Sequence, residues 1–142
     1  MINFQLVSLD GVKFSEDVYE VVLPTMDGEI GVLSKHMPLI SVAKRGVISV
    51  RKTAQDRDDM MEHFAISGGA IEVTGDTLRV LVDEADASEE ISEEEAKTAM
   101  ERAQKLKSVA KDQISLEQAQ SLIDRSAVRL QVAGMKRRSR RG

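Results

Sequence analysis

The sequence predicts a protein in two parts, an N-terminal antiparallel β-sandwich or barrel followed by a C-terminal antiparallel hairpin of two helices. Up to about residue 82, short apolar or alternating runs are separated by turn residues, which is typical of strands. The acidic run at residues 83–88 predicts a linker. Beyond it, apolar residues recur at helical spacing in two stretches, each with a capping box at its start. Aromatic residues are only 3% of the chain, so the core must consist mainly of Val, Ile and Leu, which favours strands. We therefore predict a β-sandwich domain at residues 1–86 and a helical hairpin with a basic C-terminal tail at residues 87–142.

The predicted strands begin at residue 2, where apolar and polar residues alternate as in a half-buried strand. A second strand is expected at residues 18–23 and ends at Pro24. The polar run at residues 52–59 is typical of a long exposed hairpin loop, and the Gly-containing pairs at 10–11, 27–28 and 75–76 and the triplet at 67–69 are typical of turns. Further strands are expected at residues 29–33, 38–42, 47–51, 63–66, 70–73 and 78–82.

The two predicted helices carry narrow apolar stripes rich in alanine. Ser92 to Glu95 forms the first capping box, and the second starts at Ser115, so two helices of similar length are expected. At about 25 cal/mol per Å² of apolar surface, alanine-lined helices gain only a few kcal/mol from packing. We therefore expect a hairpin that is weakly held and can move. The two stripes run through Ala96, Met100, Ala103, Leu106 and Ala110, and through Leu116, Ala119, Ile123, Ala127 and Leu130.

Composition and charge exclude several classes of protein. The absence of cysteine excludes disulfide frameworks, thiol catalysis and cysteine-ligated zinc. We expect no signal peptide, because no basic segment precedes an apolar one at the start, and no run of about 18 apolar residues predicts a membrane span. The net charge of -4 argues against a generic nucleic-acid binder. The basic end at residues 136–141 either meets an acidic partner, lipid or nucleic acid, or only keeps the chain soluble.

No combination of residues predicts catalysis or metal binding. The two histidines, His36 and His63, have no regularly spaced cysteines or acids to complete a metal site. For His63, in a predicted strand, a structural or surface role is expected. The Ser67-Gly68-Gly69 segment lacks the lysine and the glycine spacing of a phosphate-binding loop, so a tight turn between strands is expected. The acids at residues 89–95 point in different directions on a helix and suit a solvated face near a helix N-terminus. We expect a protein that is not an enzyme by itself.

One segment carries a family resemblance. Residues 23–39 read LPTMDGEIGVLSKHMPL, and this segment resembles the signature of the epsilon subunit of bacterial F-type ATP synthase, a G-E-x-G-V-L-x-x-H-x-P-L pattern. Residues 64–69, FAISGG, are similar to the F-A-V-S-G-G turn of that family. The resemblance covers almost the whole chain and weakens only in the loop after Arg51 and in the basic tail.

The resemblance implies a non-catalytic rotor subunit of a proton- or sodium-translocating synthase. The sandwich would sit at the foot of the central stalk against the gamma subunit and the c-ring. The hairpin would fold beside it, or extend along gamma to the alpha and beta subunits and block ATP hydrolysis. The complex would lie at the cytoplasmic face of the bacterial plasma membrane, with this chain bound peripherally. The residues implied to face the c-ring, on loops, are Glu29 and His36, and the alternative for His36 is a structural hydrogen bond within its loop. Those implied to make inhibitory contacts are Arg125, Arg129, Lys136, Arg137 and Arg138.

The family's nucleotide motif is altered here. Some members bind ATP through [I/L]-D-x-x-R-A at the first helix start, helped by two arginines one turn apart on the second helix. In this chain Ile91 is kept, but Ser92 replaces the aspartate and Glu95 replaces the arginine. A carboxylate at position 95 would repel a polyphosphate, so we expect no cofactor and no tight ATP binding. The remaining basic positions of the motif are matched by Arg102, Arg125 and Arg129, for which a solvated or partner-facing helix surface is the favoured interpretation.

Two other functions fit the same pattern. A stand-alone ligand-binding β-sandwich would use the hairpin as a lid, and it would not co-purify with gamma. An RNA- or lipid-binding module would use the basic tail, but the scarcity of aromatic residues for base stacking argues against RNA.

Overall fold

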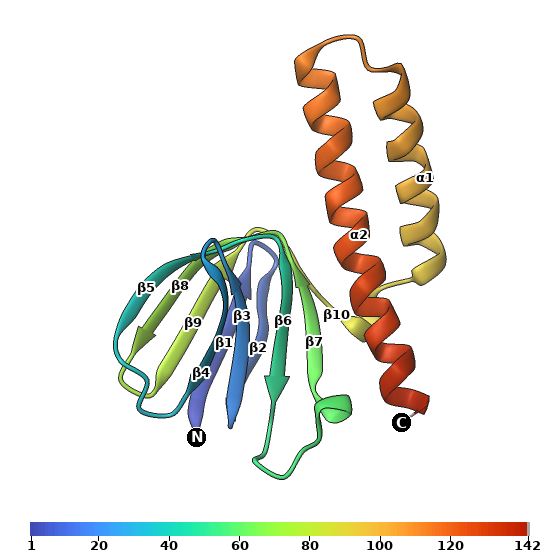
Figure 1. The fold of residues 1–142 in the computed structure, drawn as a ribbon. Coiled ribbons are helices and arrows are strands. Elements are labelled where there is room, and N and C mark those ends of the chain that lie inside the picture. The colour runs from blue at the N-terminus through green and yellow to red at the C-terminus, as the bar shows by residue number, and fades with distance from the viewer. Residues whose placement is uncertain (142) are drawn as a thin grey trace.

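A computed structural model describes the backbone of residues 1–141 and the side chains of residues 1–135. A β-sandwich is followed by two long antiparallel helices, which confirms the predicted fold class (Figure 1). The described strands are β1 (Ile2–Ser8), β2 (Gly11–Val18), β3 (Glu20–Thr25), β4 (Gly28–Leu33), β5 (Leu39–Ala43), β6 (Gly46–Arg51), β7 (Glu62–Ile66), β8 (Gly69–Thr74), β9 (Thr77–Val82) and β10 (Ala85–Ala87), and the helices are η1 (Asp58–Met60), η2 (Ser88–Glu90), α1 (Glu93–Val109) and α2 (Gln113–Arg141).

The strands form two groups of five. One group has the order β4-β3-β6-β7-β10 and the other β5-β8-β9-β1-β2, and the single pair Thr25 and Ala43 joins β3 to β5. The prediction of an antiparallel sheet holds for every described pair except one, because β1 runs parallel to β9. Apolar alternation identifies a strand but not its partner, and these two strands are far apart in the sequence.

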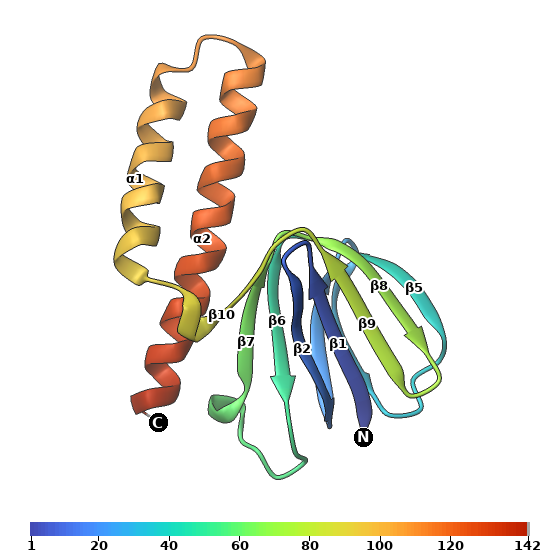
Figure 2. The ribbon, with the colours of Figure 1, turned by 180° about the vertical axis from the view of Figure 1, so that it is seen from behind.

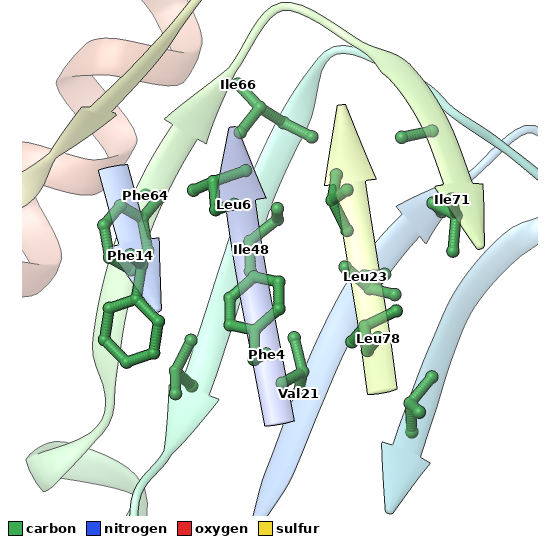
Figure 3. Packing of buried hydrophobic residues seen from close by; sticks show 14 of the residues in the cluster. Phe4, Leu6, Phe14, Val21, Leu23, Ile48, Phe64, Ile66, Ile71 and Leu78 are labelled. Carbon is green, nitrogen blue, oxygen red and sulfur yellow. The ribbon is translucent and has the colours of Figure 1, made fainter. Parts of the chain in front are cut away.

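The core lies between the two groups and consists mainly of aliphatic residues. Phe4, Leu6, Leu23, Ile48 and Leu78 are fully buried there, as Figure 3 shows. All three phenylalanines of the chain gather at one side of the core, because Phe14 lies 5.4 Å from Phe4 and 5.7 Å from Phe64 between ring centroids.

Three strand predictions were wrong. Residues 83–88, expected as a linker, contain strand β10, which pairs with β7. Strand β2 was missed because most of its side chains are exposed and its sequence therefore shows no apolar alternation. Pro24 was expected to end a strand, but it lies inside β3. This position needs no backbone N–H, since β3 pairs with β6 up to Val22 and with β5 at Thr25, and Pro24 falls between the two partners.

The helix starts were predicted with mixed success. Ser92 caps α1, because its hydroxyl accepts a hydrogen bond from the Glu95 N–H at 3.2 Å, as predicted. Helix α2, however, begins at Gln113 rather than at a Ser115 cap. The carboxylate of Asp112 accepts the Ser115 N–H at 2.7 Å, so an acid three residues earlier takes the capping role. The expected similar lengths were also wrong, since α1 has 17 residues and α2 has 29.

The hairpin touches the sandwich over a small area. Both views show α1 and the start of α2 standing clear, while the C-terminal half of α2 lies beside β7 and β10 (Figures 1 and 2). The apolar contact there is a cluster of four buried residues, Ala65, Ile91, Val132 and Ala133, with Val47 and Val128 at its border.

Candidate functional site

Two acids of the sandwich and two arginines of α2 meet where the hairpin joins the sandwich. The Arg125 guanidinium donates to Glu84 Oε1 through Nε at 2.8 Å and lies 2.7 Å from it through Nη2. Arg129, one turn further along α2, donates to Asp86 Oδ2 and lies 3.7 Å from Glu84 Oε1. We call Glu84, Asp86, Arg125 and Arg129 the junction cluster. Its inner pair is the more shielded, since the side chains of Arg129 and Asp86 are 18% and 23% exposed.

The backbone holds the two acids in place. Ser67, in the turn between β7 and β8, donates its N–H to the Glu84 carbonyl and accepts the Glu84 N–H on its hydroxyl. Asp86 lies in β10 opposite Ala65 of β7. The backbones of both acids are therefore fixed to the sandwich, independently of the helix that their carboxylates meet.

The space beside the junction cluster is a cleft of about 30 Å³. Arg45, from the turn between β5 and β6, also lines the cleft, and its guanidinium donates to the Ser121 carbonyl of α2 at 3.4 Å. A space of this size holds about one or two water molecules. The enclosed space is therefore much smaller than a nucleotide.

The four positions related to ATP binding do not form one site. Arg125 and Arg129 belong to the junction cluster, while Ile91 is buried in the apolar contact between α2 and the sandwich. Arg102 lines a separate, open depression along α1. Ser92 and Glu95 lie in that same depression, which places a carboxylate near the arginine that was expected to assist binding.

The two residues expected to face the c-ring lie at opposite ends of β4. Glu29 was expected on a loop, but it is the second residue of β4 and is exposed. The difference arises because Glu29 pairs with Pro24 across the β3–β4 hairpin, which extends the strand beyond the turn glycine. His36 does lie in a turn, and its Nδ1 is 2.7 Å from the Met37 carbonyl oxygen. This short contact fits the structural alternative for His36, a hydrogen bond within its own loop.

The turn that carries His36 is held by hydrogen bonds to a neighbouring turn, which the sequence did not indicate. Lys35 has φ 64, and Asp76 of the β8–β9 turn accepts hydrogen bonds from the Ser34 hydroxyl at 3.3 Å and from the Lys35 N–H at 3.4 Å. The turn that carries His36 is thereby fastened to its neighbour.

Sequence reasoning also missed an apolar surface on the outside of the sandwich. Met26, Ile40, Val42 and Leu81 are exposed by 70%, 86%, 57% and 47%. The register sets Val42 opposite Ala70, and Ala70 opposite Leu81, so these three side chains lie in one row across β5, β8 and β9. Ile40, two residues before Val42, lies on the same face, and we call Ile40, Val42, Ala70 and Leu81 the apolar row. A signal existed in the sequence, because both faces of β5 are largely apolar, which a half-exposed strand does not need.

Three positions of the basic tail fall outside the described side chains: Lys136, Arg137 and Arg138. Within the part of the chain that the structure describes, no group of three or more acidic, histidine or cysteine residues is placed to hold a metal ion. Likewise, no helix among the described residues is long and apolar enough to cross a membrane. His63 lies in β7, where its Nδ1 is 2.8 Å from the Ser49 hydroxyl, which fits the predicted structural role.

Comparison with known proteins identifies the family. Residues 1–88 match the family model described as the β-sandwich domain of the ATP synthase delta/epsilon chain. The ATP synthase epsilon chain of Moorella thermoacetica is 32% identical over 94% of this chain and 96% of its own length. The chain belongs to the ATP synthase epsilon-chain family. The epsilon chain of Staphylococcus aureus strain JH9 is 33% identical over 95% of this chain and 98% of its own length. As an epsilon chain, the protein is a non-catalytic subunit of ATP synthase.

Solved structures agree with this assignment. A chain in the Euglena gracilis mitochondrial ATP synthase, in a structure of OSCP, F1 and the c-ring, is 25% identical, with a TM-score of 0.78 over 93% of this chain and 80% of that one. A chain in the central stalk and c-ring structure of the Tetrahymena thermophila mitochondrial ATP synthase has a TM-score of 0.57 over 94% of this chain and 96% of that one. At 15% identity, it supports the fold alone.

Proposed function

We propose that this epsilon chain is a central-stalk subunit of an F-type ATP synthase, in which the sandwich binds gamma and the c-ring and the hairpin restrains ATP hydrolysis. The observation that carries the proposal is the difference between the large core of the sandwich and the small apolar contact that attaches the hairpin to it. The sandwich has its own core of nineteen buried residues, whereas the hairpin meets it through a cluster of four. A firmly folded domain with a loosely attached helical arm suits a permanent linker that carries a movable element.

The apolar row on the outer face of the sandwich is the surface that we assign to gamma. Ile40, Val42 and Leu81 lie on an outer sheet face and are exposed in the free chain. Exposed apolar patches rimmed by polar residues mark sites of protein association. The rim here includes Glu72 and Arg79, which face each other across β8 and β9.

We assign β4 and the turn after it to the c-ring. Among the described strands β4 pairs only with β3, so its outer side is an open edge. Glu29 and His36 mark its two ends, and a partner that touches both must follow the strand lengthwise. Through such contacts the chain would be held peripherally at the cytoplasmic face of the bacterial plasma membrane.

The inhibitory role rests on the basic side of α2. When the hairpin extends, Arg125 and Arg129 leave the sandwich and meet acidic segments of the beta subunits, beside alpha, in the catalytic head. Lys136, Arg137 and Arg138 continue the same positive charge along the helix sequence. Charge complementarity of this kind weakens as salt screens it.

Truncation of the chain tests this function. Removing residues 87–142 should leave assembly with gamma intact, because the core of the sandwich lies almost wholly within residues 1–86. The hydrolysis rate of the reconstituted synthase should rise severalfold. Replacing Arg125 and Arg129 with alanine should relieve part of the inhibition, and removing residues 136–142 somewhat more. If the truncated chain assembles and the rate stays unchanged, the hairpin is not an inhibitor, and only the stalk role remains.

A further inference from the structure

The arginines expected to contact the catalytic head are already paired inside the chain. With the hairpin beside the sandwich, Arg125 and Arg129 are both held by carboxylates of the sandwich. We propose that Glu84 and Asp86 form an internal latch that pairs with these arginines and holds the hairpin against the sandwich without a bound nucleotide. Partner carboxylates that exchange with the internal ones then favour release of the hairpin.

The geometry of the junction cluster suits a latch. Arg125 and Arg129 are four residues apart on α2 and therefore project from one face of the helix. Both approach Glu84 Oε1, and Arg129 also reaches Asp86, so one carboxylate bridges two guanidiniums. Charge-assisted hydrogen bonds of this type are roughly twice as strong as neutral ones. Because Arg129 and Asp86 are largely shielded from water, salt should screen their pair less than an exposed one.

The latch accounts for a large share of the contact between hairpin and sandwich. The apolar part has only four buried residues, two of which are alanines. Arg45 adds one more polar contact, to the Ser121 carbonyl. A change of charge at the junction cluster should therefore shift the balance between folded and released hairpin by a measurable factor.

The excess of positive charge around the cleft allows partner carboxylates to replace the internal ones. Three arginines line the cleft, at positions 45, 125 and 129, against the two carboxylates Glu84 and Asp86. The local charge is thus positive even when the latch is closed, and it attracts an approaching acidic surface. A protein partner with several carboxylates can then compete for Arg125, the more exposed of the two latch arginines.

Double spin labelling of the free chain tests the latch. The sequence has no cysteine, so labels on Lys44→Cys and Gln118→Cys, two exposed positions that flank the contact between Arg45 and Ser121, report only the distance between the sandwich and the hairpin. At low salt we expect one short distance. In the Glu84→Gln, Asp86→Asn variant, the ratio of folded to released hairpin should fall by at least about threefold, as expected for the loss of partly shielded ion pairs.

Matched variants separate the latch from general charge effects. Glu89→Gln, at an exposed acid outside the junction cluster, removes one charge and should leave the distance unchanged. The exchanged pair Asp86→Arg, Arg129→Asp should restore much of the short distance that each single change loses. An unchanged distance in the Glu84→Gln, Asp86→Asn variant, or equal losses in the Glu89→Gln control, would overturn the latch.

Hydrolysis measurements extend the test to the assembled enzyme, and this step rests on the proposed inhibitory function. The Glu84→Gln, Asp86→Asn variant frees the arginines for the catalytic head, so inhibition should strengthen severalfold. The opposite result, weaker inhibition with a hairpin shown to be released in the free chain, would contradict exchange of the arginines. Failure of the inhibitory function itself would appear separately, as no effect of truncation.

Discussion

Ser67 and Glu84 exchange two hydrogen bonds, one from the Ser67 N–H to the Glu84 carbonyl and one from the Glu84 N–H to the Ser67 hydroxyl, each 3.0 Å long. The pair ties the β7–β8 turn to the segment that leaves the sandwich for the hairpin. It also fixes the backbone of the residue whose carboxylate receives Arg125. A structural turn and the attachment of the hairpin are thus linked through one serine.

Replacing Ser67 with alanine should weaken both the β7–β8 turn and the attachment of the hairpin. The variant leaves the Glu84 N–H without its acceptor, and an unmet backbone donor of this kind costs about 1–3 kcal/mol. Urea unfolding of the full chain should show a loss of free energy in this range. Ser15→Ala, at an exposed position of β2, provides the control and should change little. A loss as small as that of the control would mean that water replaces the hydroxyl.

Gly69 should tolerate no side chain. A Cβ there would lie 1.9 Å from the Leu81 carbonyl oxygen, so the backbone of β8 or β9 would have to move. Gly69→Ala should cost several kcal/mol, within the range of severe single substitutions. Gly75→Ala is the matched control, because its backbone has φ 59 but its Cβ would meet open space. That change should cost only about 1–2 kcal/mol, the penalty of a left-handed conformation. Thermal unfolding of the two variants compares them directly, and equal losses would contradict the steric argument.

Structural features set by neighbouring residues could be predicted from the sequence, whereas those set by residues distant in the sequence could not. The cap at Ser92 was predictable because a cap involves neighbouring residues. The parallel pairing of β1 with β9 was not, because alternation in each strand says nothing about its partner. Glu84 and Asp86 had looked like an acidic linker, and only the three-dimensional structure brings them to Arg125 and Arg129. The contact residues of a movable element are distant in sequence, so local patterns do not indicate them.

Asp112 should make the start of α2 sensitive to acid. Hydrogen bonds from the Ser115 backbone lower the pKa of the Asp112 carboxyl below its ordinary value. A group with a lowered pKa in the folded state stabilises it above the unfolded pKa, near pH 4, and this contribution is lost as the pH falls through the folded pKa. Asp112→Ala should therefore reduce helix content at pH 7 but have much less effect at the most acidic pH. Asp112→Asn keeps a capping side chain and should lose only the pH dependence. Circular dichroism of the three chains between pH 7 and pH 2 provides the measurement, and parallel titration curves would rule out a role of the carboxylate.

The isolated chain should bind ATP weakly, with a Kd above about 1 mM. Arg125 and Arg129 are engaged by Glu84 and Asp86, and Glu95 lies in the same depression as Arg102. Calorimetry without magnesium measures the affinity. The Ser92→Asp, Glu95→Arg variant, which restores the family motif, should bind more tightly than the natural chain. Micromolar affinity of the natural chain would show that the charge at position 95 is tolerated.

The apolar row on the outer sheet face should be required for assembly but not for folding. Val42 and Leu81 are exposed by 57% and 47%, so Val42→Asp and Leu81→Asp should leave the unfolding free energy of the isolated chain nearly unchanged. In a buried interface each carboxylate would lose its water without gaining a partner, which costs several kcal/mol. A cost of about 2.7 kcal/mol already lowers affinity a hundredfold, so the double variant should fail to co-purify with gamma. Leu106→Asp is the control, since this leucine is 52% exposed but lies on α1, away from the sandwich. It should assemble normally. Retention of gamma by the double variant would show that the interface lies on another face. Loss of gamma in the Leu106→Asp control as well as in the double variant would point to a general effect of added charge.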